Sequence, residues 1–461
     1  MKNIFGLLLV AGLAVPALAD QPASVSRDDV RAMVSEMMSD AETRSSLLQG
    51  GATGGYDRNF FLASADNKYR LSISGFTQIR YTANVNDTDN TLGGVNAGNP
   101  ALGADGTGSD YRGGFNLRRT VVAFNGNAGS ESLKYSVRIA SVDGQNLRFD
   151  DAFVAYELGS GWSVKAGQYK VGFTKESLNS DVYTMAADRG FVDAYFGQGR
   201  SQGASLYYRS DAFDASFDLT DGLKGENRPT FGEDSDSTSN NRLAADYAFT
   251  GRGEYRFAGT RAQLQDYTSR QDEKFAGNVG FAGHFQGDAN NNDTTASLLA
   301  ADQPSDTNIF GYTIDAQVEG GGFGAFIALV GTHSEQSFLG GGNKFKLDDF
   351  GFVAQANYRI LAETDLFAKY EMIVLDKDRT TGTPAREVQR YTQFVTAGAN
   401  QYFAGNAAKL TADVVVGLNH TADLAGQQVI GGPGFNGNAL GLTGTNKGAE
   451  IALRVQLQVM F

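Results

Sequence analysis

One long segment of the sequence, residues 171–201, gathers charges of both signs together with apolar side chains. Its charged members are the cations Lys175, Arg189 and Arg200 and the carboxylates Glu176, Asp181, Asp188 and Asp193. Such a set of charges does not by itself catalyse a reaction. Opposite charges that face one another across water do, however, create an electric field that acts on ions between them. Apolar residues such as Leu178 and Val182 predict that the segment packs against protein instead of extending into solvent.

The residue types that most enzyme chemistry needs are scarce. The sequence contains 0 Cys, which excludes a disulfide framework, a cysteine nucleophile, a Cys-based zinc site and an iron–sulfur cluster. Only 3 His occur, and His284 and His420 fall on polar strand faces with no obvious Ser nucleophile beside them. The net charge of −13 argues against a nucleic-acid partner. We therefore expect no catalytic residue, no metal and no cofactor.

Residues 1–19 have the composition of a secretory signal peptide. Lys2 supplies the positive start, residues 4–18 are uncharged and mostly apolar, and Ala17-Leu18-Ala19 forms an A-x-A cleavage site. The apolar run is shorter than the ~20 residues that a membrane-spanning helix needs. An uncleaved N-terminal anchor is the alternative. The segment indicates export from the cytoplasm.

Residues 20–67 are expected to form a helical periplasmic segment and linker. Ser26 and Asp29 resemble a capping box, apolar residues then recur every three to four positions, and Gly50-Gly51 ends the expected helix over 26–49. This helix either packs on the rest of the chain or forms a short coiled coil that joins protomers or spaces the protein from the cell wall.

From residue 68 onward the hydrophobic pattern repeats every two residues, which is typical of β-strands with one apolar face. The last strand shows it most clearly, with Ile451, Leu453 and Val455 on one face and Arg454 and Gln456 on the other. The strands predicted in this way are 69–83, 115–125, 132–141, 148–158, 162–170, 202–210, 213–221, 242–250, 275–286, 308–319, 323–334, 347–360, 363–375, 391–403, 408–419 and 449–461. They are long enough for the ~9–11 residues with which a tilted strand crosses a bilayer.

The connections between these strands alternate between long and short. Connections after odd-numbered strands, such as 84–114, are long, whereas those after even-numbered strands, such as 159–161 and 361–362, are short. Outer-membrane barrels have short periplasmic turns and long extracellular loops, so the alternation favours a barrel over a soluble sandwich. Residues 251–274 break the alternation and indicate either an elaborated periplasmic turn or a missed pair of strands.

The fold class that follows is an all-β membrane protein: a 16-stranded antiparallel transmembrane β-barrel over residues 68–461, preceded by the periplasmic helix. A sheet in lipid must close, because every backbone N–H and C=O needs a partner within the protein. Sixteen strands enclose a water-filled channel, with the apolar face toward lipid and the polar face toward water. Basic residues on the polar face are taken as pore-lining candidates, namely Arg70, Arg80, Lys134 and Arg138.

Two positions are open to segment 171–201. Folded into the barrel it would form a constriction with Lys175, Arg189 and Arg200 as its cations, and folded outward it would cover the rim. The charges on the polar strand faces are of both signs, so the residues leave the preference between anions and cations open.

Several motifs resemble those of a known family. "YRLSISGFTQIRY" (69–81), "FNLRRTVVAFNG" (115–126), "LKYSVRIA" (133–140) and "VKAGQYKVGFTKESL" (164–178) resemble the opening strands and third loop of the phosphate-selective porins O and P. The resemblance implies a trimeric sixteen-stranded barrel with an inward third loop and anion preference through basic residues near the constriction. It also implies that Lys170 and Lys175, in the "GQYK…TKE" motif, lie at the mouth of the pore.

The function expected from the pattern and the resemblance is passive diffusion. Small hydrophilic solutes or ions, anions such as phosphate among them, would cross the bacterial outer membrane through a homotrimer surrounded by outer-membrane lipid. The alternative is a structural or adhesive surface protein, with the N-terminal helix as a periplasmic spacer or oligomerisation element.

Overall fold

Most of the chain is described by the structure, a computed structural model. The described residues are 52–57, 59–85, 111–223, 245, 247–287, 304–338, 345–381, 386–421, 424, 440–444 and 449–461. Residues Gly54–Phe461 make up one compact unit. The expected signal peptide (1–19) and the expected helix (26–49) lie outside the described residues. Within the described ranges no helix combines the length and the apolar character that crossing a membrane would take.

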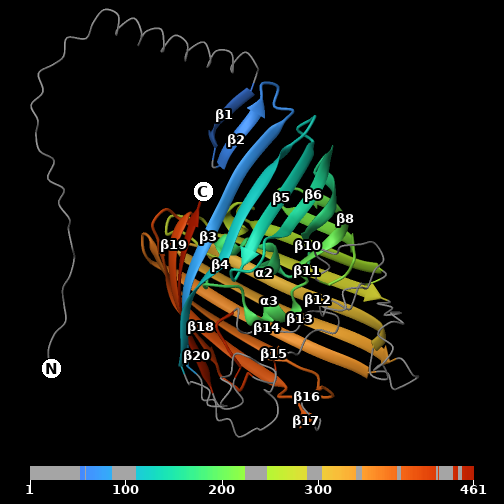
Figure 1. Cartoon of the computed structure of the whole chain (residues 1–461), viewed down its shortest axis with the longest axis vertical. Coiled ribbons are helices and arrows are strands. Elements are labelled where there is room, and N and C mark those ends of the chain that lie inside the picture. Colours follow the sequence, from blue (N-terminus) through green and yellow to red (C-terminus); the bar gives the residue numbers. More distant parts are fainter. Residues whose placement is uncertain are drawn as a thin grey trace, which may run out of the picture. The chain divides into compact units, whose positions relative to one another are not determined.

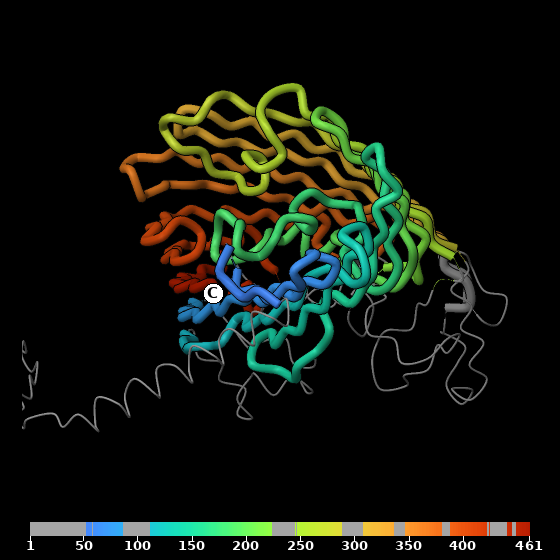
Figure 2. Tube along the Cα trace, turned by 90° about the horizontal axis from the view of Figure 1, so that it is seen from above, coloured from blue at the N-terminus to red at the C-terminus, as the bar shows by residue number. Residues whose placement is uncertain are grey.

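Sixteen strands follow one another around a closed ring (Figures 1 and 2). They are β3 (Arg70–Val85), β4 (Tyr111–Asn127), β5 (Leu133–Val142), β6 (Arg148–Gly159), β7 (Trp162–Lys170), β8 (Arg200–Arg209), β9 (Phe213–Thr220), β10 (Tyr247–Ala258), β11 (Ala276–Gly287), β12 (Pro304–Gly320), β13 (Phe323–Phe338), β14 (Phe345–Leu361), β15 (Thr364–Val374), β18 (Tyr391–Tyr402), β19 (Ala408–Gly417) and β20 (Glu450–Met460). Each pairs antiparallel with its neighbours, and β20 pairs with β3, as in Arg454 opposite Thr82. The predicted closed barrel of 16 antiparallel strands is confirmed.

Side chains alternate between the two faces of the barrel wall as the sequence pattern predicts. On β20 the exposed fraction is 45% for Ile451 and 44% for Leu453, against 0% for Ala452 and 2% for Arg454. Large apolar side chains are likewise exposed on the other strands, while Asn, Gln, Asp and Arg side chains of the same strands are buried. The outer face is thus apolar and the inner face polar, which is the arrangement that suits lipid outside and water inside.

One predicted strand is displaced, and this explains the irregular connection. The eighth strand was expected at 242–250, but β10 runs to Ala258, because Arg252 and Arg256 continue the inward face and Tyr255 the outward one. The remaining connection, 259–275, contains a short 3-10 helix, η2 (Gln263–Gln265), and no further strands. It is therefore an elaborated turn, the first of the two interpretations.

The expected linker before the barrel contains two short strands that the sequence pattern did not reveal. These are β1 (Ala52–Asp57) and β2 (Asn59–Ser64). The last strand, β20, pairs with β3 only between Phe76 and Val85. The earlier part of the same β3 edge pairs instead with β2, with Leu62 opposite Leu71. The added strand satisfies backbone groups that would otherwise form an open edge.

The connection between β7 and β8, residues 171–199, folds into the barrel, and it is called the inward loop below. It contains α2 (Lys175–Leu178), a 3-10 turn, η1 (Asp181–Tyr183), and α3 (Phe191–Phe196). The α3 helix contacts β13, β14 and β15, while Asp188 of the loop bonds to Arg80 of β3 at another part of the ring. Figure 2 shows the loop, in green, within the ring of strands. The inward position expected for this segment is confirmed.

Gly167 on β7 provides a test of the strand packing. Its φ of +127° is unfavourable for other residues, and a Cβ there would lie 2.3 Å from the carbonyl oxygen of Ala152 on β6. We expect Gly167→Ala to lower the free energy of unfolding by about 1–3 kcal/mol. Urea unfolding in lipid vesicles, followed by the fluorescence of Trp162, the single tryptophan, measures the change.

Gly251→Ala on β10 is the matched control, because a Cβ at Gly251 would have no heavy atom within 4 Å. The free energy of unfolding of Gly251→Ala, measured in the same urea experiment, should stay close to that of the wild type. Equal effects of the two substitutions would contradict the assigned contact.

Candidate functional site: the constriction and its basic cavity

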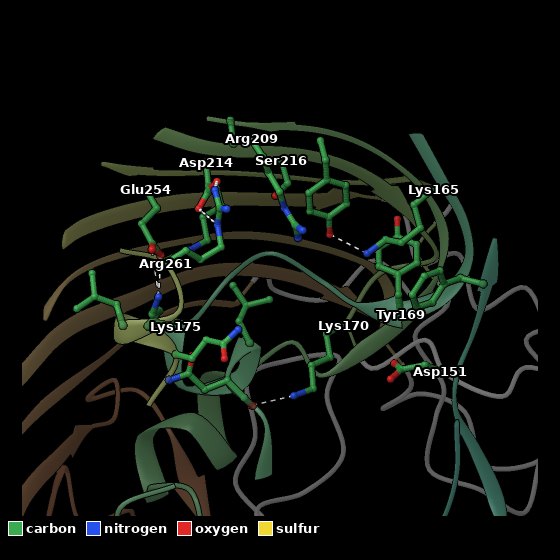
Figure 3. A pocket seen from close by; sticks show the side chains of 18 residues that line it. Asp151, Lys165, Tyr169, Lys170, Lys175, Arg209, Asp214, Ser216, Glu254 and Arg261 are labelled. Atoms are coloured by element: carbon green, nitrogen blue, oxygen red, sulfur yellow. Dashed lines mark hydrogen bonds and ion pairs between the residues drawn. The ribbon is translucent and has the colours of Figure 1, made fainter. Parts of the chain in front are cut away.

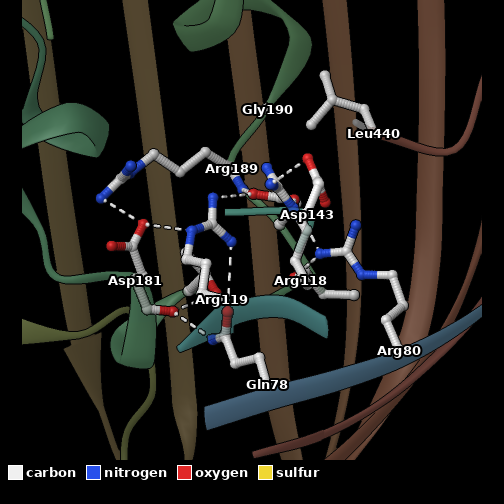
Figure 4. Close-up of polar contacts among 12 residues, drawn as sticks. Gln78, Arg80, Arg118, Arg119, Asp143, Asp181, Arg189, Gly190 and Leu440 are labelled. Carbon is white, nitrogen blue, oxygen red and sulfur yellow. Dashed lines mark hydrogen bonds and ion pairs between the residues drawn. The ribbon is translucent and has the colours of Figure 1, made fainter. Parts of the chain in front are cut away.

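Asp188, in the inward loop, is the centre of a buried ion-pair cluster at the barrel wall. Figure 4 shows the guanidinium groups of Arg80, Arg118 and Arg119 gathered in this region. Asp188 Oδ2 lies 2.8 Å from Arg80 Nη2 and 2.6 Å from Arg118 Nε, and Asp188 Oδ1 lies 2.8 Å from Arg119 Nη2. Arg80 also donates to the carbonyl oxygen of Ala187, at 2.8 Å. One carboxylate of the loop thus pairs with guanidinium groups from β3 and β4 and holds the loop against these strands.

A β-bulge explains why two consecutive arginines reach this carboxylate. Gln78 of β3 pairs with Arg119 of β4, but the next residue, Ile79, pairs with Leu117, so Arg118 is the additional residue. In a regular strand, neighbouring side chains point to opposite faces, and a bulge breaks that rule locally. Both Arg118 and Arg119 are buried on the inner side as a result.

The cluster also keeps Asp188 charged. Burial by itself would raise the pKa of the Asp188 carboxyl, but Arg118, Arg119 and Arg80 hold this pKa well below its usual range. Because the carboxylate remains ionised, the attraction that anchors the loop persists through the physiological pH range.

Further contacts attach the loop elsewhere around the barrel. Asp181 pairs with Arg138 of β5 (3.1 Å) and with Arg189 of the loop itself (2.9 Å). Glu176 Oε1 lies 2.6 Å from Lys369 Nζ of β15. These contacts, from β5 to β15, fix one side of the loop to the wall.

The α3 helix, together with Ala187 before it, adds apolar packing and backbone hydrogen bonds to this attachment. The ring of Phe191 stacks on that of Phe394 of β18, with 3.9 Å between centroids. The N–H of Val192 donates to Glu371 Oε1 at 3.1 Å. The N–H of Ala187 donates to Asp413 Oδ2 of β19 at 2.9 Å. The loop is therefore a fixed part of the interior, held by charge and by packing.

A cavity of ≈ 390 Å³ remains between the loop and strands β6 to β10, and it is called the basic cavity (Figure 3). Its charged lining consists of six cations, Lys165, Lys170, Lys175, Arg209, Arg252 and Arg261, and three carboxylates, Asp151, Asp214 and Glu254. Phe153, Tyr169 and Tyr207 supply aromatic rings. Cations therefore outnumber carboxylates around this space.

The elaborated turn 259–275 contributes to the cavity from the end of the barrel opposite to the long loops. Arg261, Leu264 and Gln265 line the cavity, and Arg261 is held by an ion pair with Asp214 of β9. The turn is tied down by Tyr267, whose ring lies 5.0 Å from that of Phe326 on β13. The constriction is thus built from two inward-folded segments.

The cations of the cavity differ in how they are compensated. Lys175 Nζ lies 3.0 Å from Glu254 Oε2, and Arg252 Nη1 lies 2.7 Å from Asp315 Oδ2. By contrast, among the residues that the structure describes, no carboxylate comes within 4.0 Å of the charged nitrogens of Lys165, Lys170 or Arg209. These three cations leave a net positive field in one part of the cavity.

The residues singled out from the sequence divide into three groups. Lys170 and Lys175 line the basic cavity. Arg80, Arg138 and Arg189 anchor the inward loop, and Arg189 also donates to the carbonyl oxygens of Glu176 and Asn179. These anchoring residues hold the inward loop in place and do not themselves line the basic cavity.

The other three candidates lie in the wall. Arg200 belongs to β8 and not to the loop, and its Nε lies 2.8 Å from Asp151 Oδ1. Lys134 forms an exposed ion pair with Glu157 near the short-turn end. Arg70 lies over the ring of Phe61, 4.0 Å from its centroid, also near that end. The structure does not bring Lys134 and Arg70 together with the inward loop.

Sequence reasoning missed Arg118, Arg119, Arg209, Arg252 and Arg261 as residues of the site. Strict alternation cannot place both Arg118 and Arg119 inside, and the other three fall at the end of a strand, in a displaced strand and in an unassigned connection. A basic residue in the irregular segment 251–274 was the signal that could have identified Arg252 and Arg261.

A closed sixteen-stranded barrel narrowed by an inward loop defines a porin, and solved structures agree in fold. The chain is similar to an anion-selective porin from Comamonas acidovorans (13% identity, TM-score 0.50, 85% of this chain and 99% of that one). It is also similar to the outer-membrane channel DcaP of Acinetobacter baumannii (13%, 0.50, 86% and 99%) and to OprB of Pseudomonas putida (9%, 0.50, 91% and 96%). Among curated protein sequences, none matches significantly.

The family is shown by its sequence model. The model for the phosphate-selective porins O and P matches residues 91–420, and the chain belongs to this family. It is accordingly a porin of the outer membrane, a channel for the passive diffusion of small hydrophilic solutes. The family and the fold are those of a channel and not of an enzyme.

The Asp188 cluster generates a prediction about the constriction. Asp188→Asn leaves three buried guanidinium groups without their shared carboxylate, and the loss of one partner from a buried ion pair costs about 3–5 kcal/mol. We expect the inward loop to detach from β3 and β4, so that single-channel recordings show larger and noisier current levels.

Asp143→Asn is the matched control, since Asp143 pairs with the same Arg118, at 2.9 Å, but lies outside the inward loop. Its current should resemble that of the wild type. A quiet, unchanged Asp188→Asn channel would show that the cluster does not hold the loop.

Proposed function

We propose that this porin conducts anions in preference to cations and that the basic cavity is the conducting passage. The observation that carries the proposal is the group of three cations without a carboxylate partner, Lys165, Lys170 and Arg209, beside the inward loop. Other cations that line the cavity are paired with carboxylates, as Lys175 is with Glu254 and Arg252 with Asp315. An ion that enters the constriction therefore meets a positive excess.

The negative charge of the whole chain, −13, does not oppose this preference. A passing ion responds to charges within about one Debye length, roughly 8 Å at physiological ionic strength. In a narrow passage with protein walls the nearby charges act through a lower effective dielectric constant than that of water. The lining of the constriction therefore outweighs distant acidic residues. The description of one structural neighbour as an anion-selective porin is consistent with the proposal.

The preference is measured as the zero-current potential across a planar bilayer in a KCl gradient. The wild type should show the sign expected for chloride selectivity. Removing one cation at about 4 Å from the ion path removes about 1 kcal/mol or more of attraction, so Arg209→Gln should lower the chloride-to-potassium permeability ratio by about fivefold. Lys170→Gln should act in the same direction.

Lys134→Gln is the matched control, because Lys134 faces inward on β5 but lies near the short-turn end and does not line the cavity. Its permeability ratio should equal that of the wild type. A wild-type potential of the sign for potassium selectivity would refute the proposed anion preference.

We further propose that the mature protein begins at Asp20, after cleavage of residues 1–19, and that it forms a homotrimer with residues 20–67 in the periplasm. The A-x-A site and the family resemblance support these points. Protein isolated from outer membranes should give Asp20 as its first residue and migrate as a trimer without heating. A first residue at Met1 would contradict the proposed cleavage, and a monomer in gentle detergent would contradict the proposed trimer.

A further inference from the structure

Two of the three uncompensated cations of the basic cavity, Lys165 and Arg209, lie beside aromatic rings. Lys165 Nζ lies 3.8 Å from the ring centroid of Tyr169, 4.4 Å from that of Tyr207 and 5.2 Å from that of Phe153. It also donates a hydrogen bond of 2.8 Å to the hydroxyl of Tyr207. Arg209 extends over the Tyr207 ring, at 5.7 Å. Figure 3 shows Lys165 and Tyr169 side by side at one end of the cavity.

The opposite end of the cavity has a different chemistry. There the cations Lys175 and Arg261 are matched by Glu254 and Asp214, and aromatic rings are absent from that part of the described lining. The cavity therefore has an ion-paired end and a cation–aromatic end. Only the cation–aromatic end combines excess positive charge with flat apolar surface.

A small hydrated inorganic anion would use the charge at the cation–aromatic end but not the rings. Aromatic rings interact favourably with other rings through offset stacking or edge-to-face contact, and they bury apolar area. Phe153 and Tyr207 are only partly buried in the wall, so part of each ring faces the cavity. The volume of ≈ 390 Å³ is within the range of sites for small organic molecules.

We propose that the cation–aromatic end of the basic cavity is a binding subsite for aromatic carboxylates. The carboxylate would be attracted by Lys165, Lys170 and Arg209, and the ring of the solute would contact Phe153 and Tyr207. The inference rests on the proposed anion passage. It adds that, among anions, aromatic carboxylates bind in this passage most tightly.

The test uses the full-length porin in planar bilayers, with benzoate, acetate and inorganic phosphate as blockers of the chloride current. Benzoate and acetate carry the same charged group and differ in the ring. We expect half-block by benzoate at a concentration at least about fivefold lower than by acetate, the effect of one aromatic contact. Phosphate should resemble acetate.

Substitutions separate the ring contact from the charge. Phe153→Leu keeps an apolar side chain but removes the ring, so block by benzoate should fall toward that by acetate while acetate itself is unchanged. Lys165→Gln should weaken the block by both anions. Tyr156→Leu, on the exposed outer face of the same strand β6, is the control for the first variant, and Lys134→Gln is the control for the second.

Each outcome bears on a different statement. Equal block by benzoate and acetate in a chloride-selective wild type overturns the aromatic subsite and leaves the anion preference standing. A potassium-selective wild type overturns the proposed function itself. Phosphate as the strongest blocker, insensitive to Phe153→Leu, assigns the site to inorganic anions and also overturns the subsite. If Phe153→Leu does not fold, judged by its unheated gel mobility, Tyr207→Ile replaces it with the same expectation.

Discussion

The constraint on which the rest of this structure depends is the closure of the sheet. In lipid no water can satisfy a free backbone group, so the last strand has to pair with the first. Once β20 pairs with β3, the alternation of side chains along each strand divides the residues into a lipid-facing and an inward-facing set. The inward set brings many charged groups close together in a narrow space. How these charges are compensated then decides where solutes can pass.

The inward loop provides part of that compensation, on one side of the barrel. Its carboxylates Asp188, Asp181 and Glu176 neutralise cations of β3, β4, β5 and β15, and the loop is held against those strands. Strands β6 to β9 face the other side of the loop and receive less of this compensation. The same segment therefore narrows the pore and leaves its positive excess beside the remaining space, which links the attachment of the loop directly to ion preference.

The elaborated turn 259–275 is the second segment, besides the inward loop, that lines the basic cavity. Periplasmic turns of outer-membrane barrels are generally short and contribute little to the pore. Here Tyr267 and Leu264 are buried, so the turn has its own apolar anchor, and Arg261 is held at the cavity by Asp214. Because the turn and the inward loop come from opposite ends of the barrel, the cavity between them is lined on both sides by segments that are fixed in place.

The sequence alone determined most of the barrel strands, their inner and outer faces and the packing of the third loop against protein, while its inward position was implied by the family resemblance. These follow from local rules, because a period of two residues assigns each side chain to a face, and an apolar loop has to pack. The tertiary structure alone decided which inward charges meet. The bulge at Arg118 turns two adjacent arginines to one side, β10 extends through Ala258, and Lys165 lies among rings from β6, β7 and β8. Such contacts depend on strand register and on residues far apart in the chain, and neither is contained in a two-residue pattern.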